Sequence, residues 1–167
     1  GTGDGCLVAS GFLSGGSPPF TGLFNPDGDL DWNFLYGLDG NGDWTLEITD
    51  IFGGDDGTLN SWTIDFGPFV SQFSGSSAPA LAIPDSDPLG TTDTITFACA
   101  PPAITALCVE INITHSWDSD LDIWLIPPGG MAPGIELSTD NGGSGDNYTG
   151  TVFTGSVDPC FGGSSIT

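Results

Sequence analysis

Asp118, Asp120 and Asp122 alternate in the acidic stretch WDSDLDIW. Alternate residues of an extended strand project to the same face, so we expect these three carboxylates to stand together at a strand or its entrance. Clustered carboxylate oxygens are the ligands that Ca²⁺ prefers in proteins. The stretch therefore points to calcium, and the plainer alternative is a solvated acidic surface that keeps the protein soluble.

A second acidic stretch, DGNGDWTLEITD, superficially has the spacing of an EF-hand calcium loop. Positions 1, 3, 5 and 12 of such a loop are occupied by Asp39, Asn41, Asp43 and Asp50. The sixth position is Trp44, where the EF-hand needs glycine for its turn. Residues 44–50 also alternate between apolar and polar types, as a half-buried strand does, and a strand would carry Asp50 roughly 23 Å from Asp43. We therefore expect a local turn rather than an EF-hand.

The chain has one histidine, His115, and nucleophilic catalysis would need a serine and an aspartate beside it. No GxSxG motif occurs, and the catalytic motifs of subtilisin-type enzymes are absent. We expect His115 to be a hydrogen-bonded residue at the end of a strand. The sequence thus predicts no catalytic residues and a chain that is not an enzyme.

The four cysteines form an even set, and in a chain of extracellular character this favours disulfides. Zinc is a poor alternative because no CxxC pair exists and only one histidine is present. Four cysteines allow three connectivities. We favour Cys99 with Cys108, which flank the stretch APPAIT. We also favour Cys160 with Cys6, which would come close in sequence if the chain were one unit of a polymer, with Thr167 of one unit next to Gly1 of the following unit.

The charge of the chain excludes two classes of partner. It carries 22 Asp and Glu residues and no Lys or Arg, for a formal net charge of −22. Without basic side chains it cannot displace the counterions of nucleic acid or bind an anionic membrane surface. No apolar signal segment or membrane-spanning run is present. We expect a secreted or cell-surface protein whose export signal lies elsewhere.

The pattern of apolar residues predicts a β protein. The 27 glycines and 13 prolines indicate many turns, and no window has a clean helical period. Residues 44–50 and 61–66 have the pattern of a hairpin, and 68–82, which is uncharged and rich in Ser, Ala and Pro, is typical of a linker. Further strands are expected at 94–99, 106–113, 120–126 and 134–137. Together these elements predict an antiparallel all-β sandwich or jelly roll.

Two groups of motifs resemble a known domain. THSWDSDLDIWLIPPGG followed by DNGGSGDNYTGTVF resembles the first half of the P domain, or P/Homo B domain, of proprotein convertases. Residues 82–97 look like the opening strand of that domain. SPPFTGLFNPDGDL followed by NGDWTLEITDIFGGDDGTLNSWTIDF resembles its second half. In the family the second group follows the first, so the two halves stand here in swapped order.

The resemblance implies three segments: residues 1–67 as the C-terminal half of a sandwich, 68–82 as a linker and 83–167 as the N-terminal half. Two arrangements fit this order. In a circular permutant the two halves close into one domain, whereas in a polymer each half is completed by a neighbouring subunit. A head-to-tail contact that does not close on itself propagates into a filament. Unpaired strand edges strongly favour finding the missing half.

The resemblance also bears on the acidic residues. Asp120 falls on the DL position of the family pattern, while Asp50 and Asp55 fall on its TD and GD positions. Because some P domains bind Ca²⁺, the predicted calcium ligands are Asp118, Asp120, Asp122, Asp50 and Asp55. The alternative is that Asp50 and Asp55 cap turns by accepting hydrogen bonds from backbone N–H groups.

Two functions from different classes follow. We expect an extracellular structural repeat or subunit of a filament or surface adhesin, assembled head to tail with copies of itself by strand complementation and disulfides. The alternative is the accessory P domain of a secreted protease, or a calcium-dependent module that binds a surface or glycan.

Exposed aromatic residues and a sequon would serve the glycan-related functions. Trp32, Trp62, Trp117 and Trp124 could form a platform for sugars, although Trp44, Trp62 and Trp124 lie on apolar strand faces and are expected in the core. Asn147 begins the sequon Asn-Tyr-Thr in a polar loop and is the candidate glycosylation site.

Overall fold

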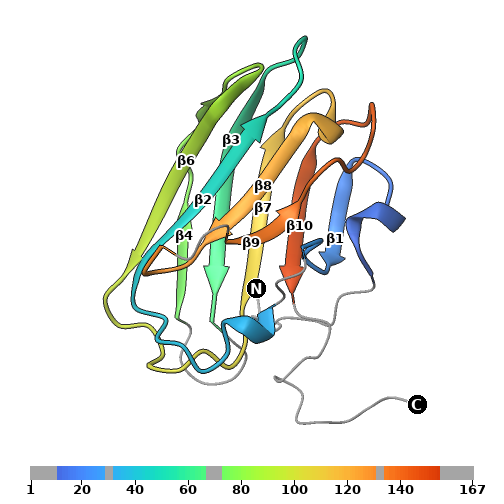
Figure 1. Ribbon diagram of the computed structural model, residues 1–167. Helices are drawn as coiled ribbons and strands as arrows, with labels where there is room; N and C mark the ends of the chain where they lie inside the picture. The colour runs from blue at the N-terminus through green and yellow to red at the C-terminus, as the bar shows by residue number, and fades with distance from the viewer. Residues whose placement is uncertain (1–10, 29–31, 67–72, 131–133, 155–167) are drawn as a thin grey trace, which may run out of the picture.

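The computed structural model describes residues 11–28, 32–66, 73–130 and 134–154. This part of the chain forms two β-sheets and three short 3-10 turns (Figure 1). The strands are β1 Phe20–Phe24, β2 Gly42–Asp50, β3 Gly57–Asp65, β4 Ser74–Ser77, β5 Leu81–Ile83, β6 Asp87–Phe97, β7 Cys108–Thr114, β8 Leu121–Ile126, β9 Ile135–Ser138 and β10 Tyr148–Thr154. The turns are η1 Leu13–Gly15, η2 Trp32–Phe34 and η3 Asp118–Asp120.

The two sheets form a sandwich that is mostly antiparallel. One sheet has the order β1-β10-β7-β3-β4, with β5 also paired to β3, and the other has the order β6-β2-β8-β9. Only β1 and β10 run parallel among the paired strands of the described residues. Apolar side chains from both sheets meet in one core. The predicted all-β sandwich is confirmed.

The alternation expected for residues 44–50 is present in β2. Trp44, Leu46 and Ile48 are fully buried, and the residues between them are half-buried on the other face. Because β2 lies between β6 and β8, its inner face packs into the core while its outer face meets solvent. The expectation for Trp124 was wrong, because it falls between buried Ile123 and Leu125 on β8 and is therefore half-buried on the outer face.

Strands from the two ends of the chain complete each other. The predicted hairpin is wrong, because β2 and β3 do not pair with each other but lie in different sheets. β2 pairs with β6 and β8, and β3 pairs with β7, so both strands have neighbours from the later half of the sequence. Trp62 of β3 adds a polar link between the sheets, since its indole Nε1 donates to Asp93 of β6 over 2.7 Å. Within this one chain, the apolar faces of the two halves cover each other.

The described part of the 68–82 segment belongs to the sandwich. β4 and β5 both pair with β3, which places residues 74–77 and 81–83 in a sheet. A Cβ atom on Gly75 would lie 2.7 Å from Ile95 and 2.6 Å from Phe97, so β4 packs closely against β6 of the other sheet. This contact closes the sandwich on one side. Residues 68–72 lie outside the described residues.

The cysteine pairing expected for Cys99 and Cys108 is wrong. Cys99 is a free and exposed thiol that follows β6, whereas Cys108 begins β7 in the opposite sheet. A disulfide needs Cα atoms about 4.4–6.8 Å apart, while packed sheets are about 10 Å apart. Cys6 and Cys160 lie outside the described residues.

Two glycines with nearly the same positive φ test how closely β6 approaches β2 at Gly90. Gly90 and Gly150 have φ values of 55° and 56°, but a Cβ on Gly90 would lie 2.2 Å from the carbonyl oxygen of Ile48, whereas one on Gly150 meets nothing within 4 Å. We expect Gly150→Ala to lower the free energy of unfolding by about 1 kcal/mol through its backbone conformation alone. Gly90→Ala should cost a further 1–3 kcal/mol, roughly, because the backbones must move apart. Equal losses in denaturant unfolding would contradict the close β2–β6 contact.

Candidate functional site

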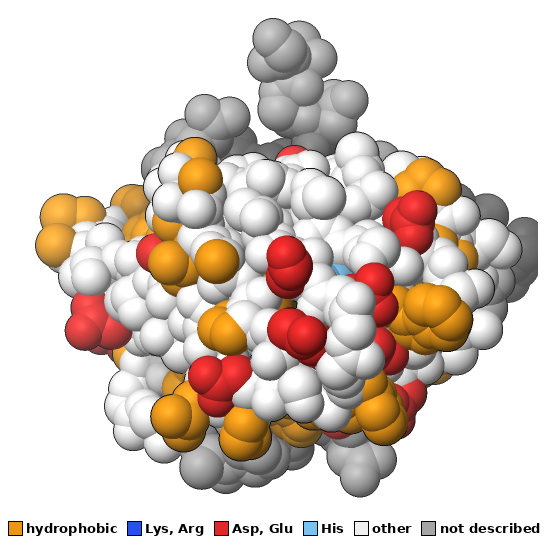
Figure 2. All heavy atoms as spheres, turned by 90° about the horizontal axis from the view of Figure 1, so that it is seen from above, with side chains coloured by type: hydrophobic (Ala, Val, Ile, Leu, Met, Phe, Trp, Pro, Cys, Tyr) orange, Lys and Arg blue, Asp and Glu red, His pale blue; other side chains and the backbone are white. Residues whose placement is uncertain are grey.

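The predicted acidic residues gather at one end of the sandwich. Here β2 ends at Asp50, β7 ends at Thr114, η3 leads into β8, and β10 begins. Figure 2 looks down on this end and shows several Asp and Glu side chains on the surface, with a small visible part of the single histidine between them. The connections from β2 to β3, from β7 to β8 and from β9 to β10 therefore meet at this end, and they bring acidic residues from both halves of the chain near His115.

His115 joins the two halves at this end. Its Nε2 lies 3.2 Å from Oδ2 of Asp50, and both side chains are buried. Its Nδ1 lies 2.9 Å from the carbonyl oxygen of Trp117 and 3.1 Å from the Trp117 N–H group. A neutral ring donates from Nε2 to Asp50 and accepts at Nδ1, and a protonated ring donates from both nitrogens. Both forms keep the Asp50 bond, so His115 is the expected hydrogen-bonded histidine at a strand end.

Asp118 is the most perturbed carboxyl group at this end. Its side chain is fully buried, Oδ1 accepts from the backbone N–H of Asn147 over 2.9 Å, and Oδ2 is a buried oxygen without a partner in the described chain. Burial raises the pKa of Asp118 to about 7, and the nearby charge of Asp146 adds to the rise, whereas the Asn147 bond and His115 oppose it. Asp118 is therefore partly protonated near neutral pH.

The five predicted calcium ligands do not form one set. Asp50, Asp118 and Asp120 lie around His115, and the charge of Asp120 helps burial to raise the pKa of Asp50. Asp55 instead accepts a hydrogen bond from the Ser116 hydroxyl. Asp122 stands on the outer face of β8, where burial raises its pKa and Asp140 and Glu136 raise it further. In the described segments, no three His, Cys, Asp or Glu side chains are grouped closely enough to hold a metal ion.

Asp50 also fits the alternative expected of it, because its Oδ1 accepts from the backbone N–H of Phe52 over 3.2 Å. The turn at residues 39–43 is likewise local, with Oδ1 of Asp39 accepting from Asn41 N–H. Both contacts are of the type in which an aspartate closes a turn by bonding the backbone two residues later.

Asn147 has a structural part in this site that the sequence did not reveal. Its φ is +72°, its side-chain oxygen accepts from the N–H of His115 over 3.1 Å, and its own N–H donates to both His115 and Asp118. The sequence analysis singled out Asn147 only as a candidate glycosylation site, and its glycosylation stays a prediction. Only the pairing of β7 with β10 brings Asn147 beside His115.

The comparison with protein families gives a match within the first half of the chain. Residues 21–66 match the family model described as the proprotein convertase P-domain. The matched segment contains most of β1 and all of β2 and β3, with Asp50 and Asp55, and it confirms the resemblance seen in the motifs. No curated protein and no solved structure matches the chain significantly.

Replacing Asp118 should flatten the dependence of stability on pH. The pKa of Asp118 is raised in the folded state, so the folded protein holds this proton more tightly than the unfolded chain. Its contribution to the free energy of unfolding is therefore fully present below the ordinary pKa of 3.8 and is lost as pH rises through about 7. Relative to the natural protein, Asp118→Asn should gain about 1–2 kcal/mol between pH 5 and pH 8.

The control is Asp56→Asn, which removes an exposed charge from the neighbouring turn. Denaturant unfolding at several pH values measures both variants against the natural protein. If Asp56→Asn changes the profile as much as Asp118→Asn does, general charge repulsion explains the effect and the burial of Asp118 does not.

Proposed function

We propose that this chain is a non-catalytic accessory module of a secreted protein, of the P-domain type that accompanies a protease catalytic domain. The observation that carries this proposal is the P-domain match over residues 21–66, which contribute strands to both sheets of the sandwich. The module would stabilise the domain to which it is attached or engage that domain's substrate.

The chemistry around His115 supports a role without catalysis. Both ring nitrogens face groups that hold the ring in place, Asp50 on one side and the Trp117 backbone on the other. The ring is only 2% exposed, so a substrate would have to displace these partners to reach it. A histidine held in this way ties two halves of a fold together rather than moving protons to and from a substrate.

Large apolar side chains on the acidic end support contact with another protein domain. Ile51, Phe52 and Trp117 are 40%, 57% and 44% exposed. Ile51 N–H donates to the carbonyl oxygen of Asp120, so the turn after β2 lies against η3, beside Trp117. Exposed apolar groups that stand together among polar ones are typical of interaction surfaces. An extracellular location agrees with this proposal, and no helix in the described residues is long and apolar enough to cross a membrane.

The pairing of the strands favours the accessory module over the filament. A neighbouring copy could complete the sandwich by strand exchange only if β2 and β3 gave up their partners within the chain. The apolar faces that would drive such an exchange are already covered. Assembly of this kind would therefore first cost the free energy of opening the core.

We expect the isolated chain to be a monomer. Sedimentation equilibrium should give a mass near 17.1 kDa, unchanged by reductant, and electron microscopy should show no filaments. The reason is that the halves already complete each other within one chain. Regular polymers with an axial repeat of one module would reject the accessory proposal in favour of the head-to-tail filament.

Calcium binding at the acidic end stays a proposal, supported by the buried Oδ2 of Asp118, which has no partner in the described residues, and by the charge of Asp120 near Asp50. No three of the described carboxylates lie close enough together to bind one ion by themselves. These oxygens would need water or backbone carbonyls to complete a calcium shell. If the proposal is right, millimolar Ca²⁺ should raise the melting temperature, a chelator should reverse the rise, and Asp118→Asn should abolish it while Asp56→Asn keeps it. An unchanged melting temperature would remove calcium from this site.

A further inference from the structure

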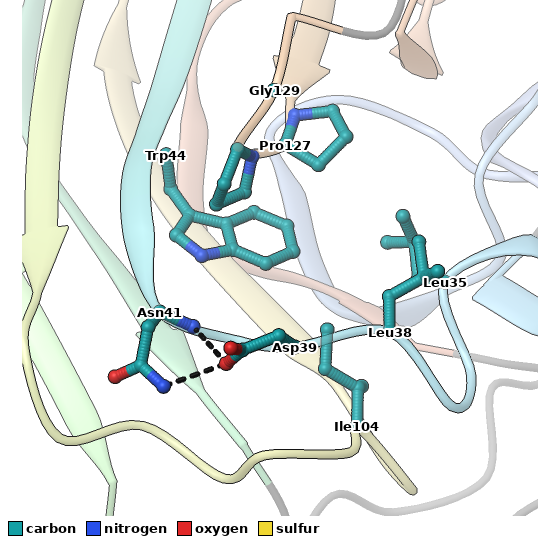
Figure 3. Close-up of a pocket in the computed structure, with 9 residues that line it drawn as sticks. Leu35, Leu38, Asp39, Asn41, Trp44, Ile104, Pro127 and Gly129 are labelled. Carbon is teal, nitrogen blue, oxygen red and sulfur yellow. Dashed lines mark hydrogen bonds between the residues drawn. The ribbon is translucent and has the colours of Figure 1, made fainter.

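A pocket of about 310 Å³ lies at the end of the sandwich opposite the acidic cluster (Figure 3). β2 runs between the two ends, since it starts at Gly42, two residues before the pocket residue Trp44, and finishes at Asp50. The pocket walls come from three parts of the chain: the segment from η2 to β2, the loop that contains Ile104, and the prolines that follow β8.

The walls of the pocket are apolar and firmly held. Leu35, Trp44 and Ile104 are buried, and Figure 3 shows the indole ring of Trp44 between Pro127 and the side of the pocket formed by Leu35, Leu38 and Ile104. The Trp44 Nε1 donates to the carbonyl oxygen of Gly40 over 2.9 Å. Two backbone bonds of 2.8 Å, from Gly37 to Ile104 and from Ile104 to Leu38, join the two loops. The pocket is therefore preformed, as binding sites for small groups commonly are.

One carboxylate stands at the rim of this apolar pocket. Oδ1 of Asp39 accepts from the backbone N–H of Asn41 over 2.9 Å and from its side-chain Nδ2 over 2.6 Å. Asn41 is fixed in turn, because its Oδ1 accepts from the N–H of Ala100 over 2.8 Å. The backbone bond and then the side-chain bond from Asn41 lower the pKa of Asp39, so this exposed group is ionised in the working range of pH. Both bonds end on Oδ1, which leaves Oδ2 open to a ligand in the part of the chain that the structure describes.

An apolar pocket with one fixed carboxylate at its rim suits a ligand that has an apolar stem and a cationic head. The chain itself has no Lys or Arg that could neutralise Asp39, and its net charge of −22 raises the local concentration of cations. The volume is at the low end for ligand pockets, which fits one long side chain better than a cofactor. Arginine meets these conditions best, because its guanidinium group is weakly hydrated and packs flat on aromatic and apolar surfaces.

We propose that this pocket binds an arginine side chain of a partner protein. The methylene stem lies between Trp44 and the Leu38 side of the pocket, and the guanidinium group donates to Oδ2 of Asp39. Leu38, which is 43% exposed at the rim, covers the stem once it is in place. This inference does not rest on the accessory function proposed above, and it concerns the other end of the molecule.

The test uses three short peptides that differ at one side chain. Acetyl-Ala-Arg-Ala-Ala-amide is the probe, citrulline in place of arginine keeps the shape without the charge, and norleucine keeps only an apolar stem. Titration of the isotope-labelled chain is followed by NMR at the indole N–H of Trp44. We expect the arginine peptide to shift this resonance at millimolar concentration and to bind about tenfold more tightly than the citrulline peptide, because a charged hydrogen bond is lost.

Variants of the chain distinguish binding in the pocket from general attraction of the cationic peptide to the acidic protein. Asp39→Asn keeps an oxygen that can accept from Asn41 and should reduce arginine affinity about tenfold, with little effect on the norleucine peptide. Leu38→Ser should weaken all three peptides. Asp56→Asn is the control, because it removes the same charge from the opposite end of the sandwich.

Three results would overturn the proposal. The first is no shift of the Trp44 resonance with the arginine peptide. The second is equal binding of the arginine and citrulline peptides, which would indicate an apolar site without charge selection. The third is an equal loss for Asp39→Asn and Asp56→Asn, which would indicate only the field of the acidic chain. None of these results bears on the monomer expected for the accessory module.

Discussion

The pairing of β2 and β3 with later strands is the constraint on which the rest of the structure depends. These two strands follow each other in the chain but lie inside different sheets, so each needs neighbours on both sides. Those neighbours are β6 and β8 for β2, and β7, β4 and β5 for β3. The hydrophobic core, the closure of the sandwich and the contact between Asp50 and His115 all depend on this pairing of early strands with later ones. A chain whose halves complete each other in this way behaves as one folding unit.

The absence of basic side chains sets a second constraint on the same fold. Carboxylates that come close to the core cannot be neutralised by Lys or Arg, so they accept hydrogen bonds from neutral groups or keep a proton. The contacts of this kind are Asp50 with the N–H of Phe52, Asp93 with the indole of Trp62 and Asp118 with the N–H of Asn147. In this fold, neutral hydrogen-bond donors satisfy carboxylates that Lys or Arg side chains could satisfy in other proteins.

The two ends of the sandwich offer different surfaces. One end combines buried carboxyl groups with exposed apolar side chains on the turn after β2 and at Trp117. The other end has a preformed apolar pocket with a single oriented carboxylate, that of Asp39. β2 connects both ends, since Trp44 lines the pocket and Asp50 bonds to His115. The accessory function proposed above would use one end for the attached domain and leave the other end free for a second protein.

The sequence by itself determined several of the strands, the fold class and the family resemblance of residues 21–66, but it placed β4 and part of β5 in a linker. Alternation such as that of Trp44, Leu46 and Ile48 is a local property, because side chains of a strand project to opposite faces in turn. Only the tertiary structure decided that Asp50 and Asp118 lie beside His115, that Asp122 points elsewhere, and that Cys99 and Cys108 stand in opposite sheets. It also made the pocket at Trp44 from three separate segments. These features depend on which strands become neighbours and in which register, and spacing along the chain does not specify that choice.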